Sequence, residues 1–362
     1  MQIQALENRG LWRDLPDGPS HSSRASIGSS AQNRLWELIW GCAIGQAVHV
    51  AVELGIPELL EAGPLSPDAI AAAISADAWS LEAVLRCLEA FEVLQSDEDR
   101  RLSLTPIGQC LLRSSCTTIA DEAGQFFDSV YGPLAALLHM VKTGDTAFDH
   151  VHGVDFYKYL AHNPALEACF YRIMTSSVAF RYATLSSIYD FSSANRVVDV
   201  GGGEGTLLLQ ILRENSRIKG VLFDVAGAID RAQQTVEASG LSHRCKLITG
   251  DFFDSIPSGA DVYILAQILN NWRDDRALRI LVNCKEAMSG NARLLILEPV
   301  HIPGIPVPPS RALISLAVMA QRGGRTRTAA QLGDLLDGAG FRLEDIHQLP
   351  SSTTHAITAS LC

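Results

Sequence analysis

The sequence lacks the features that mark several classes of protein. Its eight cysteines include no CxxC pair, and a chain of this size does not need disulfides to be stable. No uninterrupted apolar run reaches the roughly 18–20 residues that span a bilayer. The first residues hold no basic segment followed by an apolar stretch, so we expect no secretory signal. These absences predict a cytoplasmic protein without a membrane partner.

The chain also lacks an excess of positive charge. Its 29 Lys and Arg residues stand against 40 Asp and Glu, which gives a net charge of −11. Tight binding to phosphate backbones needs clustered Lys and Arg, so we expect no nucleic-acid partner. Hydrophobic residues make up 47% and charged residues 19% of the 362 residues, which is typical of globular proteins and leaves room for two domains.

The N-terminal part of the sequence predicts a tail and then a helical domain. Residues 1–31 are rich in Ser, and we expect them to be disordered. The next segment, 32–118, begins with a helix that is apolar on more than one face and therefore needs a partner from its own domain or another subunit. Two short helices and a small hairpin follow, a pattern that resembles a winged helix. Such domains often bind DNA, but residues 55–114 hold ten acidic residues against four Arg and no Lys, which disfavours that function.

The second half of the sequence predicts an α/β domain. Residues 119–190 are typical of helices, and we expect them to link the domains and contribute to a substrate pocket. From residue 191 to 362, short apolar strands alternate with amphipathic helices. That alternation predicts a Rossmann-like parallel sheet with helices on both faces, closed by two antiparallel strands at the C-terminal end.

A glycine-rich segment follows the first strand of this domain. Its spacing is G-x-G-x-G, at Gly201, Gly203 and Gly205, and Thr206 stands where a nicotinamide-binding motif needs a third glycine. Glycines at a strand–helix turn let the backbone approach a ligand closely. The spacing favours a ligand with an amino-acid tail over a pyrophosphate.

Acidic and aromatic residues end the next two strands. Asp224 stands where a carboxylate accepts hydrogen bonds from ribose hydroxyls, and Asp251 precedes Phe252, a pair suited to an adenine. Each residue has a structural alternative, because Asp224 could cap a helix and Phe252 could belong to the core. Taken together, the residues predict a nucleoside site, and S-adenosylmethionine suits the glycine spacing best.

The segments DVGGGEG, GVLFDV, ILNNW, AMSGNARLLILEP and GGRTRT carry a family resemblance. Over about residues 33–361 the chain resembles the S-adenosylmethionine-dependent O-methyltransferases of the caffeate, hydroxyindole and antibiotic-tailoring type. The resemblance implies an N-terminal helical and winged-helix domain that forms a homodimer, and a C-terminal catalytic sheet. The implied cofactor residues are Asp199, Gly201, Gly203, Gly205, Asp224, Asp251, Phe252, Gln267 and Trp272.

The chain departs from this family at the general base. Most members carry Leu-His-Asp-Trp after the fourth strand, whereas this chain has Leu269-Asn270-Asn271-Trp272. Of the two Glu that usually flank the His, Glu298 matches one and Thr326 replaces the other. The Asn-Trp pair resembles the anthracycline-tailoring branch, which includes carminomycin methyltransferase and aclacinomycin hydroxylase. There an Asn at the position of Asn271 contacts the substrate, and one member no longer methylates.

These patterns predict methyl transfer to a hydroxyl of an aromatic metabolite by positioning, with a non-methylating reaction as the alternative. Asn270, Asn271 and Glu298 are the expected catalytic residues. For the acceptor we expect contacts from His152, Met174, Met319 and Thr326, with Met319 in an apolar helix over the pocket. His150 and His152 form an H-x-H pair, but no third ligand is evident and we expect no metal.

Overall fold

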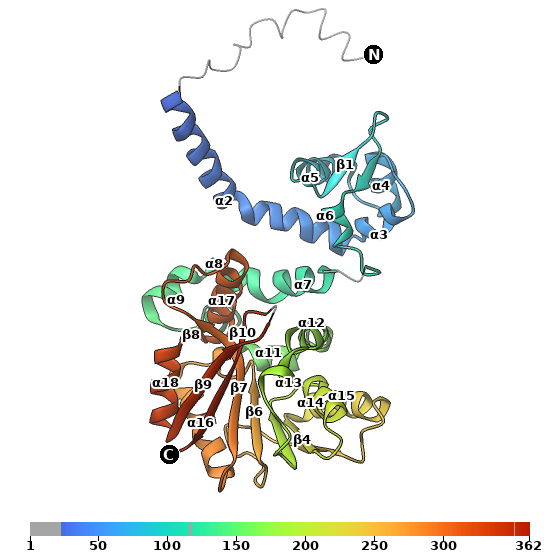
Figure 1. Ribbon diagram of the computed structural model, residues 1–362. Helices are drawn as coiled ribbons and strands as arrows, with labels where there is room; N and C mark the ends of the chain where they lie inside the picture. The colour runs from blue at the N-terminus through green and yellow to red at the C-terminus, as the bar shows by residue number, and fades with distance from the viewer. Residues whose placement is uncertain (1–22, 116–117, 351) are drawn as a thin grey trace, which may run out of the picture. The chain divides into compact units, whose positions relative to one another are not determined.

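A computed structural model describes residues 23–115, 118–350 and 352–362, without the side chains of 23–29, 177, 179 and 180. The chain forms two compact units, Met1–Thr118 and Ile119–Cys362. Helix α2 spans Ser23–Glu53 (Figure 1). The expectation of a tail over 1–31 was therefore wrong for residues 23–31, because a nucleated helix extends at little cost into neighbouring residues without Pro. Residues 1–22 lie outside the described residues.

The first unit consists of helices and one hairpin. Its remaining elements are α3 (Ile56–Glu61), α4 (Pro67–Ala73), α5 (Ala78–Ala90), β1 (Leu94–Ser96), β2 (Leu102–Leu104) and α6 (Pro106–Gln109). Ser66 caps α4 by accepting a hydrogen bond from the Ala69 amide at 3.2 Å, and Pro67 occupies the first turn. Strands β1 and β2 pair antiparallel.

Helix α2 exposes much of its apolar surface. Leu35, Trp36, Leu38, Ile39 and Trp40 are 50–62% exposed. Residues 30–53 are long and apolar enough to cross a membrane by length and composition alone, although the sequence showed no uninterrupted apolar run of that length. Only 17% of the most apolar window is buried. A surface of this size needs a partner outside the described contacts of the helix.

The second unit begins with helices that precede the sheet. They are α7 (Ala120–Gln125), the π-helix η1 (Phe126–Tyr131), α8 (Gly132–Ala135), α9 (Leu137–Thr143), α10 (Ala147–His152), α11 (Phe156–Ala161), α12 (Pro164–Arg181) and α13 (Leu185–Ile188).

An eight-stranded sheet with its helices forms the rest of this unit. The elements are β3 (Arg196–Val200), α14 (Thr206–Glu214), β4 (Lys219–Asp224), α15 (Ala226–Ala238), β5 (Cys245–Thr249), β6 (Val262–Ala266), the 3-10 helix η2 (Leu269–Asn271), α16 (Asp274–Ala287), β7 (Arg293–His301), α17 (Pro309–Arg322), β8 (Arg327–Thr328), α18 (Ala329–Gly338), β9 (Phe341–Gln348) and β10 (Thr354–Leu361). The strand order is β5-β4-β3-β6-β7-β10-β9, with β8 paired to the end of β7. The sheet is parallel except for β10, which is antiparallel to both neighbours. This confirms the predicted Rossmann-like sheet with antiparallel strands at one end.

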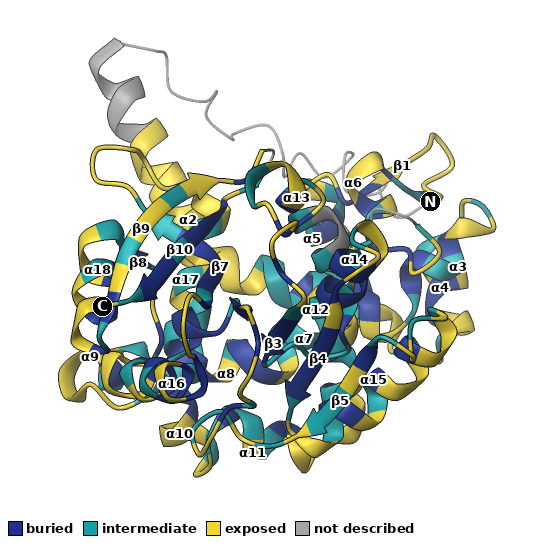
Figure 2. Ribbon diagram, turned by 60° about the horizontal axis from the view of Figure 1, so that its bottom comes forward, coloured by how far each residue is buried: buried dark blue, intermediate teal, exposed yellow. Residues whose placement is uncertain are grey.

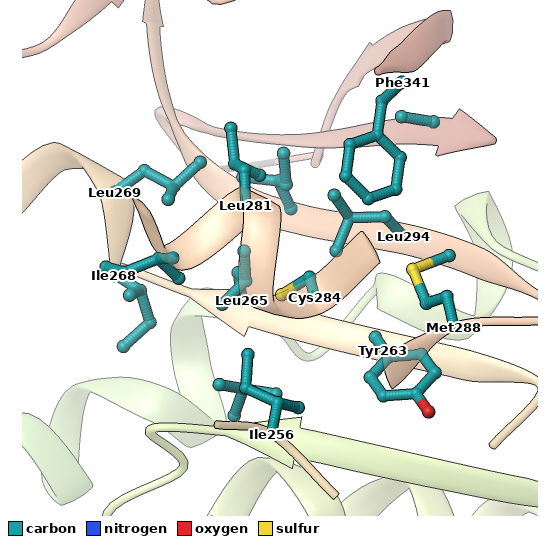
Figure 3. Packing of buried hydrophobic residues seen from close by; sticks show 14 of the residues in the cluster. Ile256, Tyr263, Leu265, Ile268, Leu269, Leu281, Cys284, Met288, Leu294 and Phe341 are labelled. Atoms are coloured by element: carbon teal, nitrogen blue, oxygen red, sulfur yellow. The ribbon is translucent and has the colours of Figure 1, made fainter. Parts of the chain in front are cut away.

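Alternate residues of the strands pack into two cores, one on each face of the sheet. Val198, Tyr263 and Leu294 belong to the core that α16 and α18 cover, whereas their neighbours Val197 and Ile264 belong to the core under α14 and α15. Figure 3 shows side chains of β6, β7, α16 and β9 pointing toward one another in the first core. Figure 2 shows the central strands mostly buried and the outer sides of α15 and α18 exposed. Strands buried on both faces explain the nearly continuous apolar runs in the sequence.

The connections of the sheet determine where a ligand can bind. Strands β4 and β5 extend it on one side of β3, and β6 and β7 extend it on the other. The order in which successive strands are added therefore reverses between β3 and β6, which are parallel, and the loops that leave their carboxyl ends diverge. In open α/β sheets, ligands bind at this crevice.

Candidate active site

A cavity of about 1310 Å³ opens at the carboxyl ends of β3, β4, β5 and β6. Its walls come from the glycine loop, from η2, and from helices α9–α12 and α17, all within the second unit. Pockets that bury one drug-sized ligand measure roughly 300–1,000 Å³. The cavity is therefore large enough for a cofactor and an acceptor together.

The glycine loop between β3 and α14 forms one wall of the cavity. Gly201, Gly203 and Gly205 have φ of 70°, 58° and 83°, in the left-handed region that favours glycine. Gly202 has no room for a side chain, because a Cβ there would lie 2.6 Å from the Asp199 carboxylate and closer still to Leu222. The loop is thus a bare backbone surface at the start of a helix.

The carboxylate of Asp199 lies beneath this loop and lines the cavity. Asp199 is 1% exposed, and neither of its carboxylate oxygens has a hydrogen-bond partner in the described part of the chain. Burial and, to a smaller extent, the neighbouring Asp224 raise the pKa of Asp199 to about 7. Two buried acceptors without donors are costly. The ammonium group of an amino-acid tail supplies both the donors and the positive charge that this carboxylate lacks.

Asp224, Asp251 and Phe252 line the same cavity at the ends of β4 and β5. One oxygen of Asp224 accepts a hydrogen bond from the backbone N–H of Gly203 at 2.8 Å, and the other accepts one from the backbone N–H of Val225 at 2.7 Å. Each carboxylate oxygen can accept a second hydrogen bond, so Asp224 keeps capacity for hydroxyls of a ligand. Asp251 accepts the amide of Phe253 at 2.8 Å. The structure therefore brings together the nucleoside-binding residues that the sequence predicts.

Aromatic rings form the wall beside Phe252. Tyr157 stacks on Trp272 with ring centroids 5.5 Å apart, and Phe252 and Phe253 both meet Trp272 edge to face. The guanidinium of Arg276 lies 3.7 Å from the centre of the Phe253 ring. This packing holds Trp272 in the cavity wall, where the sequence placed it.

The turn after β6 carries the two asparagines that replace the family His and Asp. Asn270 donates to the side-chain oxygen of Gln267 at 3.2 Å, and Asn271 donates to the Gln267 carbonyl at 2.7 Å. Gln267 has φ of 56°, which is rare for a residue with a side chain and typical of functional turns. The Oδ1 atom of Asn270 is buried and has no hydrogen-bond partner among the residues that the structure describes. Both asparagines line the cavity.

Glu298 and Arg327 brace this turn from behind. Glu298 is 1% exposed and is not among the cavity-lining residues. Its carboxylate accepts a hydrogen bond from the backbone N–H of Asn270 at 3.1 Å. Burial raises the pKa of Glu298 to about 7. Arg327, also 1% exposed, donates to the carbonyls of Leu269 and Trp272 at 2.8 Å each. Glu298, predicted as a catalytic residue, thus lies behind the turn and contacts its backbone.

Gly324 completes the support of the turn. A Cβ at Gly324 would lie 2.7 Å from the Cα of Asn271 and would overlap the carbonyl of Asn270. The GGRTRT segment therefore packs its backbone directly against the turn that carries Asn270 and Asn271. This explains the glycine and the second arginine of a motif that the sequence marked only by resemblance.

The other predicted acceptor residues separate into two groups. Met174 and Thr326 line the cavity. His152 and Met319 are not among the lining residues. His152 packs against the rings of Phe148 and Tyr159, and Met319 packs against the cluster of Met140, Ala147 and Ala320. His152 was predicted from its position in related tailoring enzymes and Met319 from the apolar content of its helix; both side chains pack against other residues of the protein instead.

The cavity lining includes residues that the sequence did not single out, and Arg322 is one of them. Arg322, at the end of α17, donates to Oδ1 of Asn271 at 2.7 Å. Its guanidinium carbon lies 4.7 Å from the centre of the Phe156 ring and 5.4 Å from that of Phe170. Burial lowers the pKa of Arg322. A basic residue in the last helical turn usually indicates only a favourable helix-dipole contact, so no sequence signal marked it.

Comparison with known proteins assigns the chain to a family. Residues 131–342 match the family model of the O-methyltransferase domain, and residues 36–114 match that of the O-methyltransferase dimerisation domain. The chain belongs to the S-adenosylmethionine-dependent O-methyltransferase family. Among its relatives, the O-methyltransferase SfmM3 of Streptomyces lavendulae is 35% identical to this chain over 321 residues, which cover 84% of this chain and 93% of the relative. Aclacinomycin 10-hydroxylase RdmB of Streptomyces purpurascens is 30% identical over 312 residues, covering 85% and 83%.

Solved O-methyltransferase structures share the fold over most of the chain. The mitomycin 7-O-methyltransferase MmcR matches with a TM-score of 0.88 and 28% identity, over 93% of this chain and all of that one. NcsB1 from neocarzinostatin biosynthesis matches with a TM-score of 0.79 and 29% identity, over 88% and 96%, and contains S-adenosylmethionine. The cofactor of the family is S-adenosylmethionine, and the unpartnered Asp199 and the bare glycine loop fit its amino-acid tail.

Proposed function

We propose that this O-methyltransferase transfers a methyl group to a hydroxyl of an aromatic or polycyclic secondary metabolite by positioning the reactants, without a general base. An amine is a less favoured acceptor. The observation that carries the proposal is the pair of amides, Asn270 and Asn271, in the cavity wall where the family has its base. Relatives support the acceptor class, because MmcR is a mitomycin 7-O-methyltransferase and NcsB1 was crystallised with 2-hydroxy-5-methyl naphthoic acid.

Nine residues would hold the cofactor. They are Asp199, Gly201, Gly203, Gly205, Asp224, Asp251, Phe252, Gln267 and Trp272. Bound there, S-adenosylmethionine supplies an electrophilic methyl group. Gln267 contributes through the turn, since its carbonyl and side chain fix both asparagines.

The remaining residues orient the acceptor. An amide takes up no proton near neutral pH, so neither Asn270 nor Asn271 can act as a base. The buried, unpartnered Oδ1 of Asn270 can accept a hydrogen bond from an acceptor hydroxyl. Met174 and Thr326 would contact the ring system, and Glu298 would support the turn from behind.

The energetic cost of a missing base is tolerable for a suitable acceptor. General-base assistance contributes about 10²–10⁴-fold. Holding two reactants in line can supply about 7–11 kcal/mol, which is the larger effect. A phenol that ionises easily would lose little from the absence of the base.

The N-terminal unit would provide the subunit contact. The exposed apolar face of α2 and the match to the dimerisation family support a homodimer, and α4, α5 and the β1–β2 hairpin would form a winged helix without a DNA-binding role. We place the enzyme in the cytoplasm.

The second candidate function is a reaction that uses the cofactor without methyl transfer, such as a hydroxylation. Two observations favour it: the similarity to aclacinomycin 10-hydroxylase and the loss of the base His. Both candidates use the same cavity.

The test is incubation of the protein with S-adenosylmethionine and a panel of polycyclic phenols. We expect S-adenosylhomocysteine to form in equal amount to a methylated product, measured by mass spectrometry. Product that forms without S-adenosylhomocysteine would support the second candidate and overturn the first.

A further inference from the structure

Arg322 brings a positive charge to the acceptor side of the cavity without an acidic partner. Within the residues that the structure describes, no carboxylate forms an ion pair with it. Its guanidinium donates to the neutral Oδ1 of Asn271, and its buried Nε atom has no hydrogen-bond partner in the described part of the chain. The rings of Phe156, Phe170 and Tyr157 have their centres 4.7–5.9 Å from the guanidinium carbon, and Arg322 is only partly exposed.

Some cationic side chains near the cavity pair with an acid, whereas others, like Arg322, contact uncharged groups. Arg231 pairs with Glu167 at 3.2 Å, and Arg327 is paired with Asp274 at 2.8 Å. Arg311, on the same helix as Arg322, donates to the hydroxyl of Thr353 at 2.8 Å. Buried charges are normally paired, since an isolated one is costly. The α17 wall contributes Arg311, Ile314, Ser315, Val318, Gln321 and Arg322 to the cavity, and none of these is acidic.

We infer that the acceptor binds as an anion and that its negatively charged oxygen pairs with Arg322. This inference rests on the proposed function, whose acceptor it defines more closely. Because Arg322 bonds directly to Asn271, the charged oxygen must lie at the acceptor hydroxyl or beside it on the same ring. The acceptor class is therefore an aromatic hydroxy acid, or a phenol acidic enough to bind ionised.

An acceptor whose reacting hydroxyl is itself ionised also explains how the enzyme dispenses with a base. A guanidinium next to a phenol favours the ionised form of the phenol. If the hydroxyl binds as its oxyanion, its proton passes to water before the complex forms. The carbon–oxygen bond then forms as the methyl–sulfur bond breaks, and the charges of oxyanion and sulfonium cancel. No proton remains to be removed during the transfer.

The test measures binding and does not depend on turnover. The protein is first saturated with S-adenosylhomocysteine, and that binding step alone reports failure of the proposed cofactor site. Two matched pairs of probes are then titrated by calorimetry at neutral pH. The first pair is an ortho-hydroxynaphthoate and its methyl ester. The second is a hydroxynaphthoquinone, which is ionised at neutral pH, and the aminonaphthoquinone of the same shape.

The wild-type protein is expected to bind the anionic member of at least one pair on the order of tenfold more tightly than the neutral member. A preference within the first pair identifies a carboxylate as the partner of Arg322, and one within the second identifies the ionised hydroxyl. In Arg322→Gln the preference is expected to disappear while the neutral members bind as before. Equal binding of both members by the wild type would overturn the inference, as would an unchanged preference in Arg322→Gln.

Two further variants complete the experiment. Arg325→Gln removes the same charge three residues away, from an exposed residue paired with Asp274 outside the cavity lining, and is expected to keep the full preference. Arg322→Lys keeps the charge without the planar donor geometry and is expected to keep part of it. If Arg322→Gln does not fold, the inference is still tested by the preference of the wild type for the anionic probes and by its reduction in Arg322→Lys. Loss of the preference in Arg325→Gln would also contradict the inference.

Discussion

The two ends of the cavity are built in different ways. At the cofactor end, backbone atoms and strand termini do most of the binding: the glycine loop, the amides that Asp224 accepts, and the acids that end β4 and β5. At the acceptor end, side chains from η2, α11, α12 and α17 form the wall, and residues far apart in the sequence support them. A backbone site tolerates little change in chemistry, whereas a side-chain wall can change its substrate through single substitutions. The predictions below test this contrast.

Gly202→Ala should have the largest effect. A Cβ at this position would overlap Leu222 and crowd Asp199, so the loop must shift away from its ligand-binding form. We expect affinity for S-adenosylhomocysteine to fall about 100-fold or more, measured by calorimetry, because ordered backbone donors cannot be replaced locally. Gly124→Ala is the matched control, since a helical Cβ there meets nothing within 4 Å. Unchanged affinity in Gly202→Ala would contradict the backbone description of this end.

Arg327→Met should destabilise the turn at the acceptor end. It removes two hydrogen bonds to the carbonyls of Leu269 and Trp272 from the interior. We expect the free energy of unfolding to fall by about 3 kcal/mol, measured in denaturant. Affinity for S-adenosylhomocysteine should change much less than kcat, because the glycine loop is untouched. A loss confined to cofactor affinity would show that the two ends are not separately built.

Asn270→His should restore a base to the turn. Among acceptors with the same ring system, we expect kcat to rise about tenfold for weakly acidic phenols. Phenols that already ionise near neutral pH should gain little, because they do not need the base. The measurement is initial rates over a series of phenols of differing acidity. An equal change across the series would mean that residue 270 does not face the acceptor hydroxyl.

Asp199→Asn separates stability from binding at the cofactor end. In the ligand-free fold the pKa of Asp199 is raised to about 7 from an ordinary value near 3.8, so the folded state holds a proton that the unfolded chain releases. The contribution of this group to stability is therefore present at low pH and is lost as pH rises from about 4 to 7.

We expect Asp199→Asn to be more stable than the wild type at pH 8 and to lose this advantage at pH 4, measured by thermal unfolding without ligand. The same variant should bind S-adenosylhomocysteine about tenfold more weakly, since it lacks the charge that pairs with an ammonium. Asp337→Asn, at an exposed position, is the control. Weaker binding without a pH-dependent gain in stability would argue against an unpaired carboxylate.

His152→Phe should have the smallest effect. His152 lies between the rings of Phe148 and Tyr159 and is not among the cavity-lining residues. Phe preserves the ring packing, so we expect KM for the acceptor to change by less than about threefold. Steady-state kinetics with one phenol is sufficient. A larger rise in KM with unchanged stability would restore His152 as a substrate contact.

The sequence predicted the cofactor end better than the acceptor end for a physical reason. Glycines that need positive φ and acids at strand ends are local signals, and the strand–helix alternation brings them to one edge. Arg322, Gly324 and Arg327 act through contacts with a turn about 50 residues earlier in the chain, and no local pattern records that contact. His152 was predicted from the family resemblance and Met319 from the apolar composition of its helix, and neither signal tells which side of a helix faces a cavity.

The place of β10 has a consequence for synthesis. This strand, Thr354–Leu361, comes after all the others in the chain yet lies between β7 and β9. Until those eight residues leave the ribosome, β9 has no neighbour and the edge of β7 stays open to other chains. The second unit therefore completes its sheet only after translation of this segment, and deletion of β10 would expose an edge of β7 and an edge of β9 at once.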